Sequence, residues 1–228
     1  YFVAVLIVAR SLGPEGRGAI AFVTVTALVA AAVAALGAPS AVSVLVHERA
    51  DKRAELLTAS VALTTVTGLG AGIIAFGGML GLGVGPAGIG DGLITACVPA
   101  AMFLALFDLC VTLLLALGRP AMFAVIVGLA PWLYAAGLVA VGLHSELTIT
   151  SAVVVWLVSI GVASLIPVAL SARAVGIGRL ELEIVRKTSS FGFKAWVGGL
   201  AGSLNFRLDQ VLMGLITTEA ALGVYALA

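Results

Sequence analysis

Apolar runs long enough to cross a bilayer follow one another along this chain, and they constrain its fold more than any single motif does. A helix needs about 20 mainly apolar residues to cross the hydrocarbon core. Of the 228 residues, 62% are hydrophobic and only 10% are charged, whereas about 25% are charged in soluble domains. The mean hydropathy is +1.23. We therefore expect an all-α integral membrane protein, a polytopic bundle of transmembrane helices.

Short charged or glycine- and proline-rich stretches set the limits of each expected span. The full spans expected are residues 18–46, 56–84, 93–117, 121–143, 148–172 and 191–216. Residues 1–9 are too short to span and lack the basic start of a signal peptide, so we interpret them as a truncated first span. The chain starts without Met in an apolar run, and it stops after a further run begins near residue 220. We expect it to be a fragment of a longer polytopic protein.

The basic residues gather in every second connection between the expected spans. This distribution predicts the orientation of the chain in the membrane, because cytoplasmic loops carry an excess of Lys and Arg. If the N-terminus is cytoplasmic, the opposite side carries only Arg10 and Arg17, and Arg207 lies within a span. The other nine of the twelve then share the cytoplasmic side: Arg49, Lys52, Arg53, Arg119, Arg173, Arg179, Arg186, Lys187 and Lys194. We predict a multi-pass protein with a cytoplasmic N-terminus.

The longest polar segment divides the chain into two parts. Residues 173–190 mix apolar and charged side chains, which suits either a helix lying at the membrane interface or a solvated linker. A short internal repeat supports a division here, since GPEGRGAIAF (13–22) is similar to TTEAALGVYA (217–226) and six spans separate them. We expect a six-span lobe over residues 1–172, a linker or interfacial helix over 173–190, and the start of a second lobe over 191–228.

The seventh expected span carries charge inside an apolar helix. Asn205 and Asp209 are one helical turn apart, and Arg207 lies on another face, so the two charges cannot simply neutralise each other. An ionisable group at bilayer depth costs roughly 2.5 to 3.5 kcal/mol and is a functional candidate by default. Arg207 could offer a planar cationic fork to an anionic substrate such as a phosphate, with Asn205 and Asp209 organising a polar cavity. The alternative is that these residues only fix the bundle.

Three further charged residues are candidates. Asp108 lies within the fourth expected span, where it could be a counter-ion for Arg207, an ion-coupling carboxylate or an acid with access to water. Arg10 and Arg17 flank a Gly/Pro turn after the first span and could reach an anionic head group, although a plain capped turn is an equal alternative.

Other side chains indicate no catalytic or metal chemistry. Cys97 and Cys110 both fall in one apolar segment, so we interpret them as small buried residues. Gly68, Gly70 and Gly72 lack the strand-turn-helix context of a dinucleotide loop, which leaves helix packing as their role. No nucleophile, base and orienting acid can be assembled, and no basic footprint for nucleic acid is present. We predict no enzyme activity, no cofactor and no metal.

Two stretches resemble a known family. ARSLGPEGRGAIAF (9–22) and NFRLDQVLMGLITTEAALGVYALA (205–228) are similar to the corresponding parts of Wzx-type oligosaccharide flippases, the polysaccharide exporters of the multidrug/oligosaccharidyl-lipid/polysaccharide superfamily. The resemblance implies a MATE-like protein of two six-helix lobes, with a cationic cavity between them. The residues that match the family's turn are Arg10, Gly13, Pro14, Glu15 and Gly18, and those that match its seventh span are Asn205, Arg207, Asp209, Gly223 and Tyr225.

The resemblance also implies a function, with alternatives. It implies that the protein moves undecaprenyl-diphosphate-linked oligosaccharide across the plasma membrane by alternating access. Its partners would then be the lipid-linked glycan, the lipid bilayer and, as further candidates, glycan-assembly membrane proteins. The central spans depart from the family pattern because they carry few cations besides Arg207. A cation-coupled drug exporter of the same superfamily would depend instead on Asp108 and Asp209. A membrane glycan polymerase or ligase would need acid and base groups in a sizeable outer loop, and the outer loops here are short.

Overall fold

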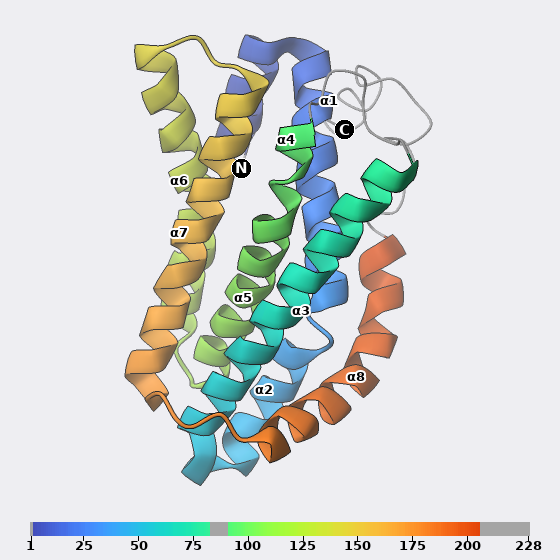
Figure 1. Ribbon diagram of the computed structural model, residues 1–228. Helices are drawn as coiled ribbons and strands as arrows, with labels where there is room; N and C mark the ends of the chain where they lie inside the picture. Colours follow the sequence, from blue (N-terminus) through green and yellow to red (C-terminus); the bar gives the residue numbers. More distant parts are fainter. Residues whose placement is uncertain (1, 83–90, 206–228) are drawn as a thin grey trace.

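The computed structural model of the chain describes residues 2–82 and 91–205, and within these ranges all regular structure is helical. Figure 1 shows the helices packed side by side as a bundle. Five described helices are long and apolar enough to cross a membrane, which confirms the expected polytopic helix bundle. In chain order, the helices are α1 (Phe2–Ala34), α2 (Ala38–Glu48), the 3-10 helix η1 (Ala50–Lys52), α3 (Arg53–Leu82), α4 (Asp91–Ile94), α5 (Cys97–Ala116), α6 (Pro120–His144), α7 (Ile149–Val175) and α8 (Leu182–Asn205).

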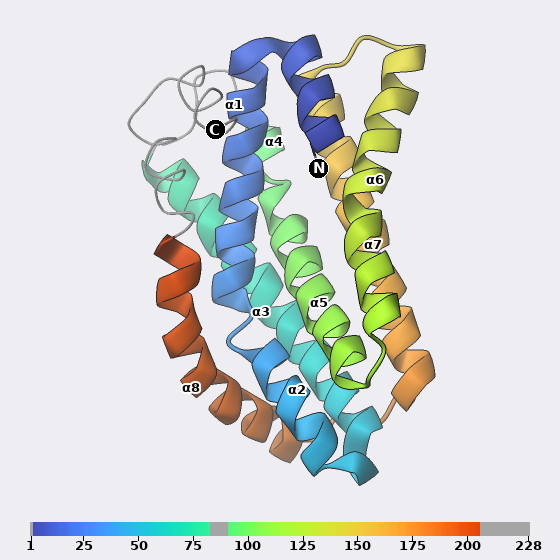
Figure 2. The same cartoon turned by 180° about the vertical axis from the view of Figure 1, so that it is seen from behind.

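Helix α1 consists of two legs that lie beside each other. Gly13 has a non-helical backbone (φ 68°, ψ −174°), a conformation that glycine adopts at little steric cost. Pro14 starts the second leg, where its missing N–H is not needed. Figures 1 and 2 show the chain arching over at this end of the bundle, here called the Gly13 end. The first expected span and the start of the second are therefore joined by a turn at Gly13.

The second expected span is broken once more, at the junction between α1 and α2. Leu36 and Gly37 both have positive φ values, of 42° and 71°, so the chain leaves the helical conformation for three residues. The Leu36 N–H donates to the Val33 carbonyl instead of the Ala32 carbonyl. Pro39 then lies in the first turn of α2, a position compatible with its fixed φ. The residues expected as one span, 18–46, therefore belong to two helices, α1 and α2.

Helix α5 lies at the centre of the bundle and contacts α1, α2, α3, α6 and α7. Cys97 and Cys110 are both buried and unoxidised in its core, as expected. Its closest approach is to α3, where a Cβ added to Gly68 would lie 2.7 Å from the Met102 Cα and one added to Gly72 would lie 2.6 Å from the Val98 Cα. These two glycines have the packing role that the sequence indicates, whereas the space beside Gly70 is open.

Helix α8 begins inside the segment expected as a linker and continues to Asn205. Its first half packs on α2, α3 and the end of α1, and Figure 2 shows it running along these elements. A Cβ added to Gly192 would lie 2.7 Å from the Leu36 carbonyl oxygen, and the Trp196 Nε1–H donates to the Ala32 carbonyl at 3.0 Å. The middle of α8 is therefore held against the broken α1–α2 junction.

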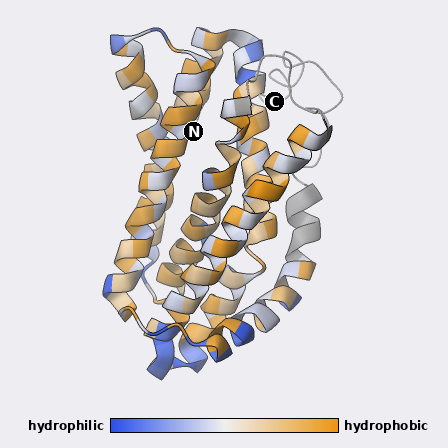
Figure 3. Cartoon of the chain, viewed as in Figure 1, coloured by the Kyte–Doolittle hydropathy of each residue, from blue (hydrophilic) through white to orange (hydrophobic). Residues whose placement is uncertain are grey.

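Polar contacts also fasten the segment between α7 and α8. The Gly178 N–H donates to Thr58 Oγ1 at 3.1 Å, and Lys52 Nζ lies 2.8 Å from Glu181 Oε2. Figure 3 shows that the charged residues of α2, η1 and α3 gather at this end of the bundle, below the largely hydrophobic spans. We call it the α2–α3 end.

Candidate substrate-facing site

Asp108 is an acid near the middle of a membrane-spanning helix. It lies 8 residues before Ala116, the last residue of α5, or about 12 Å along the axis. One turn earlier Leu104 faces a pocket that α1 and α6 line, while the adjacent Phe107 packs with α6 and α7. Asp108 therefore faces the side of α5 between α1 and α6, which Figure 2 shows from the front.

The Asp108 side chain is exposed, and within residues 2–82 and 91–205 its carboxylate has no hydrogen bond or ion pair. A carboxylate at this depth requires a partner, since its charge is costly in hydrocarbon. The structure thus shows that the acid is presented outward from α5 and is not used to hold the described helices together. Because the side chain is exposed, a cation, water or a basic side chain can reach it.

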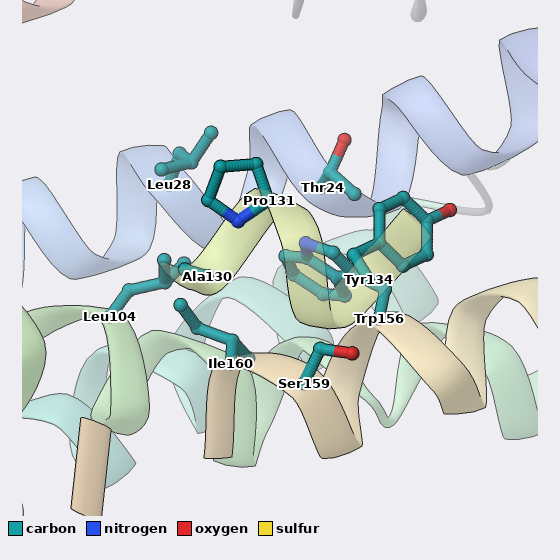
Figure 4. A pocket seen from close by; sticks show the side chains of 9 residues that line it. All are labelled: Thr24, Leu28, Leu104, Ala130, Pro131, Tyr134, Trp156, Ser159 and Ile160. Carbon is teal, nitrogen blue, oxygen red and sulfur yellow. The ribbon is translucent and has the colours of Figure 1, made fainter. Parts of the chain in front are cut away.

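A cavity of about 170 Å³ lies one turn from Asp108, between α1, α5, α6 and α7. Figure 4 shows the side chains around it. They are Thr24, Leu28, Leu104, Ala130, Pro131, Tyr134, Trp156, Ser159 and Ile160. Of these, Tyr134, Trp156 and Ile160 are buried, whereas Leu28 and Leu104 are half-buried.

The chemistry of this cavity is mainly apolar. The Thr24 hydroxyl donates to the Ala21 carbonyl at 3.0 Å, and the Ser159 hydroxyl donates to the Val155 carbonyl at 2.7 Å. Both hydroxyls therefore bind carbonyls of their own helices, and none of the described residues that line the pocket is a cation. It suits an apolar group, and it does not have the chemistry to hold a diphosphate.

Arg10 and Arg17 lie at the Gly13 end, one on each leg of α1. Arg10 is exposed, whereas Arg17 is half-buried. Thr24 and Leu104 share the pocket, and the second leg of α1 runs in the same direction as α5 (Figure 1). Arg17 precedes Thr24 by about 10 Å and Asp108 follows Leu104 by about 6 Å along the helix axes. Arg17 and Asp108 are consequently about 16 Å apart in depth. Arg10 lies on the other side of the Gly13 turn, at the same end of the bundle as Arg17, so the arginines and the acid do not form one cluster.

The seventh-span candidates are described only in part. Asn205 is described only as the last residue of α8. Arg207 and Asp209 lie outside the described residues. Their roles stay predictions.

The pocket residues Tyr134 and Trp156 were not singled out from the sequence. Aromatic residues within an apolar span have the same pattern as core residues, and both are indeed buried. The available signal was Pro131, which lies inside α6 and interrupts its backbone hydrogen bonding beside the pocket.

Comparison with known proteins identifies the family. A model described as polysaccharide biosynthesis protein matches residues 1–228, which confirms the resemblance to Wzx-type polysaccharide exporters. Neither a curated protein nor a solved structure gives a significant match. The match and the five apolar helices together indicate a multi-pass membrane protein with a polysaccharide-related transport role. The chain belongs to the polysaccharide biosynthesis protein family.

Proposed function

We propose that the protein flips an undecaprenyl-diphosphate-linked oligosaccharide across the plasma membrane by alternating access, and that it is not an enzyme. The observation that carries this proposal is the family match over every residue of the chain. A lipid-linked glycan presents two phosphates and a polar sugar that must cross about 30 Å of hydrocarbon. A transporter in two lobes can shield these groups without altering them.

In this proposal Arg207 binds the diphosphate, because a guanidinium is permanently charged and can donate two parallel hydrogen bonds to phosphate oxygens. Asn205 and Asp209 position Arg207 and the sugar, and Arg10 and Arg17 meet the anionic group at the outer face. The N-terminus is cytoplasmic, residues 1–172 form the first lobe, residues 173–190 the linker, and residues 191–228 begin the second lobe. Glycan-assembly membrane proteins receive the product.

The test is translocation of a lipid-linked glycan by the intact protein in proteoliposomes. We expect Arg207→Ala to slow flipping at least about tenfold, since a charged hydrogen bond contributes about 1.5 to 3 kcal/mol. Arg207→Lys should retain part of the rate, because it keeps the charge but loses the planar fork. Arg119→Ala, which removes an exposed cation from the α5–α6 turn, is the control. Equal rates for wild type and a folded Arg207→Ala variant would remove Arg207 from the mechanism.

A second candidate is a cation-coupled exporter of small molecules, and the unpartnered Asp108 carboxylate favours it. In that case Asp108→Asn should abolish the dependence of transport on a proton or sodium gradient. Uptake of a cationic dye into inside-out vesicles, measured with each gradient in turn, would report it. Gradient-driven dye transport without glycan flipping would replace the first proposal by the second.

A further inference from the structure

One apolar face of α7 is exposed, and a cation follows it along the helix. Four bulky side chains recur on this face at helical spacing, with exposed fractions between 45% and 58%. They are Val154, Val158, Val162 and Leu165. Arg173 continues the same face, about 12 Å beyond Leu165 at the α2–α3 end. The Arg173 guanidinium therefore lies at the depth where phospholipid head groups begin.

The segment after α7 exposes large apolar side chains although it is otherwise polar. Ile177 is 80% exposed, Leu180 is 56% exposed and Leu182 is 81% exposed. Exposed side chains of this size next to the lipid-facing side of α7 are typical of a segment that lies in the membrane interface. They therefore indicate contact with the bilayer surface.

The arginines of the same segment have no acidic partner. Arg173, Arg179 and Arg186 are all exposed, and none has an ion pair within the described residues. By contrast, Lys52 and Lys187 nearby lie 2.8 Å and 3.9 Å from Glu181 and Glu48. These three arginines are thus available to bind an external anion.

The backbone of the segment is held in place. The hydrogen bond from Gly178 to Thr58 and the pair between Lys52 and Glu181 fix it on the first turns of α3. A Cβ added to Gly178 would overlap the backbone nitrogen of Glu55, so the two backbones approach closely. The exposed side chains therefore project from a fixed scaffold.

We propose that these side chains form a binding surface for anionic phospholipids of the leaflet at the α2–α3 end. We call it the linker patch, and it consists of Arg173, Ile177, Arg179, Leu180, Leu182 and Arg186. The guanidinium groups bind lipid phosphates, to which their planar donors are matched. The three aliphatic side chains insert between the head groups. The patch holds the connection between α7 and α8 against the membrane surface.

The first test is native mass spectrometry of the intact protein, released from mixed phosphatidylglycerol and phosphatidylcholine. We expect wild type to retain phosphatidylglycerol preferentially and the triple variant R173Q/R179Q/R186Q to lose this preference at least tenfold, since each cation near an anionic surface contributes about fivefold. The charge-matched control is R49Q/R119Q/K194Q, which removes three cations outside the patch. If the two variants lose the preference for phosphatidylglycerol equally, the effect is one of general charge and the proposal is overturned. The proposal is also overturned if neither variant loses this preference.

The second test measures insertion, and it does not depend on charge. Cys97 and Cys110 are buried, so a spin label can be attached selectively at L182C or, as the control, at E183C. In phosphatidylglycerol vesicles we expect the label at position 182 to be accessible to oxygen and protected from a water-soluble nickel complex, with the reverse at position 183. A label at position 182 that is accessible to the nickel complex in vesicles would overturn the proposal. So would a label at position 182 that is already protected in detergent without lipid, because a co-purifying protein would then cover it.

Discussion

Two close helix contacts in this molecule both depend on glycine, but their surroundings differ. Between α3 and α5, Gly68 and Gly72 allow two regular helices to approach along an apolar interface. Between α8 and the α1–α2 junction, Gly192 packs against the irregular backbone at Gly37, and the indole of Trp196 adds a hydrogen bond. The first contact is made by packing alone, whereas the second combines packing with polar bonds.

The difference follows from what each contact must satisfy. Lipid chains are as apolar as leucine, so helices inside the bilayer associate through close van der Waals packing, which small residues allow. The α1–α2 junction, in contrast, leaves backbone groups without their helical partners, and these need hydrogen bonds from elsewhere. The ion pairs near the start of α8 contribute little stability, because their side chains are between 34% and 54% exposed.

The largest effect is expected at the α1–α2 junction. Gly37→Ala should destabilise the protein by about 3 kcal/mol, because a Cβ there would overlap the Gly192 carbonyl and alanine disfavours positive φ. Thermal unfolding of the intact protein in detergent measures this. Gly118→Ala is the control, since Gly118 has a φ of 74° but open space around it. If both variants lose equal stability, backbone strain alone explains the result and close packing of α8 does not.

A smaller effect is expected between α3 and α5. Gly72→Ala should cost about 2 kcal/mol, because the new Cβ would lie 2.6 Å from the Val98 Cα and the helices would have to separate. The same unfolding measurement applies. Gly70→Ala, two residues away with open space beside it, should leave the melting temperature unchanged or raise it slightly. A stable Gly72→Ala variant would show that this interface is looser than described.

The smallest effect concerns the indole hydrogen bond. Trp196→Phe keeps an aromatic ring beside Phe193 but removes the donor to the Ala32 carbonyl, so we expect a loss of about 1 kcal/mol. Trp132→Phe on the exposed side of α6 should have no effect. Should the two variants melt alike, the polar part of the α8 contact would be unnecessary.

The sequence predicted the limits of most spans within a few residues, because hydropathy and short polar breaks determine them. It did not predict the interruption after Ala34, although Gly37 and Pro39 were visible signals. Such residues also occur inside continuous membrane helices, and here the break is supported by a helix far along the chain. Local pattern alone could not supply that information.

The candidate site was predictable to a similar extent. Asp108 could be identified as an acid within an apolar span, but the direction of its side chain depends on how α1 and α6 pack around α5. The cavity beside it depends on side chains from four helices, none of which carries a recognisable motif. Arg207 and Asp209 lie outside the described residues, so their arrangement stays a prediction.

The hydrogen bond between Trp196 and Ala32 has a consequence for biosynthesis. The two residues are 164 positions apart, so the ribosome makes the donor long after the acceptor has entered the membrane. Until then the Ala32 carbonyl lacks this partner in an environment where an unsatisfied backbone group is costly. The hydrogen bonding of the α1–α2 junction is therefore completed only after α8 has been made. We expect proteases and chaperones to act mostly at this junction in early membrane-inserted intermediates.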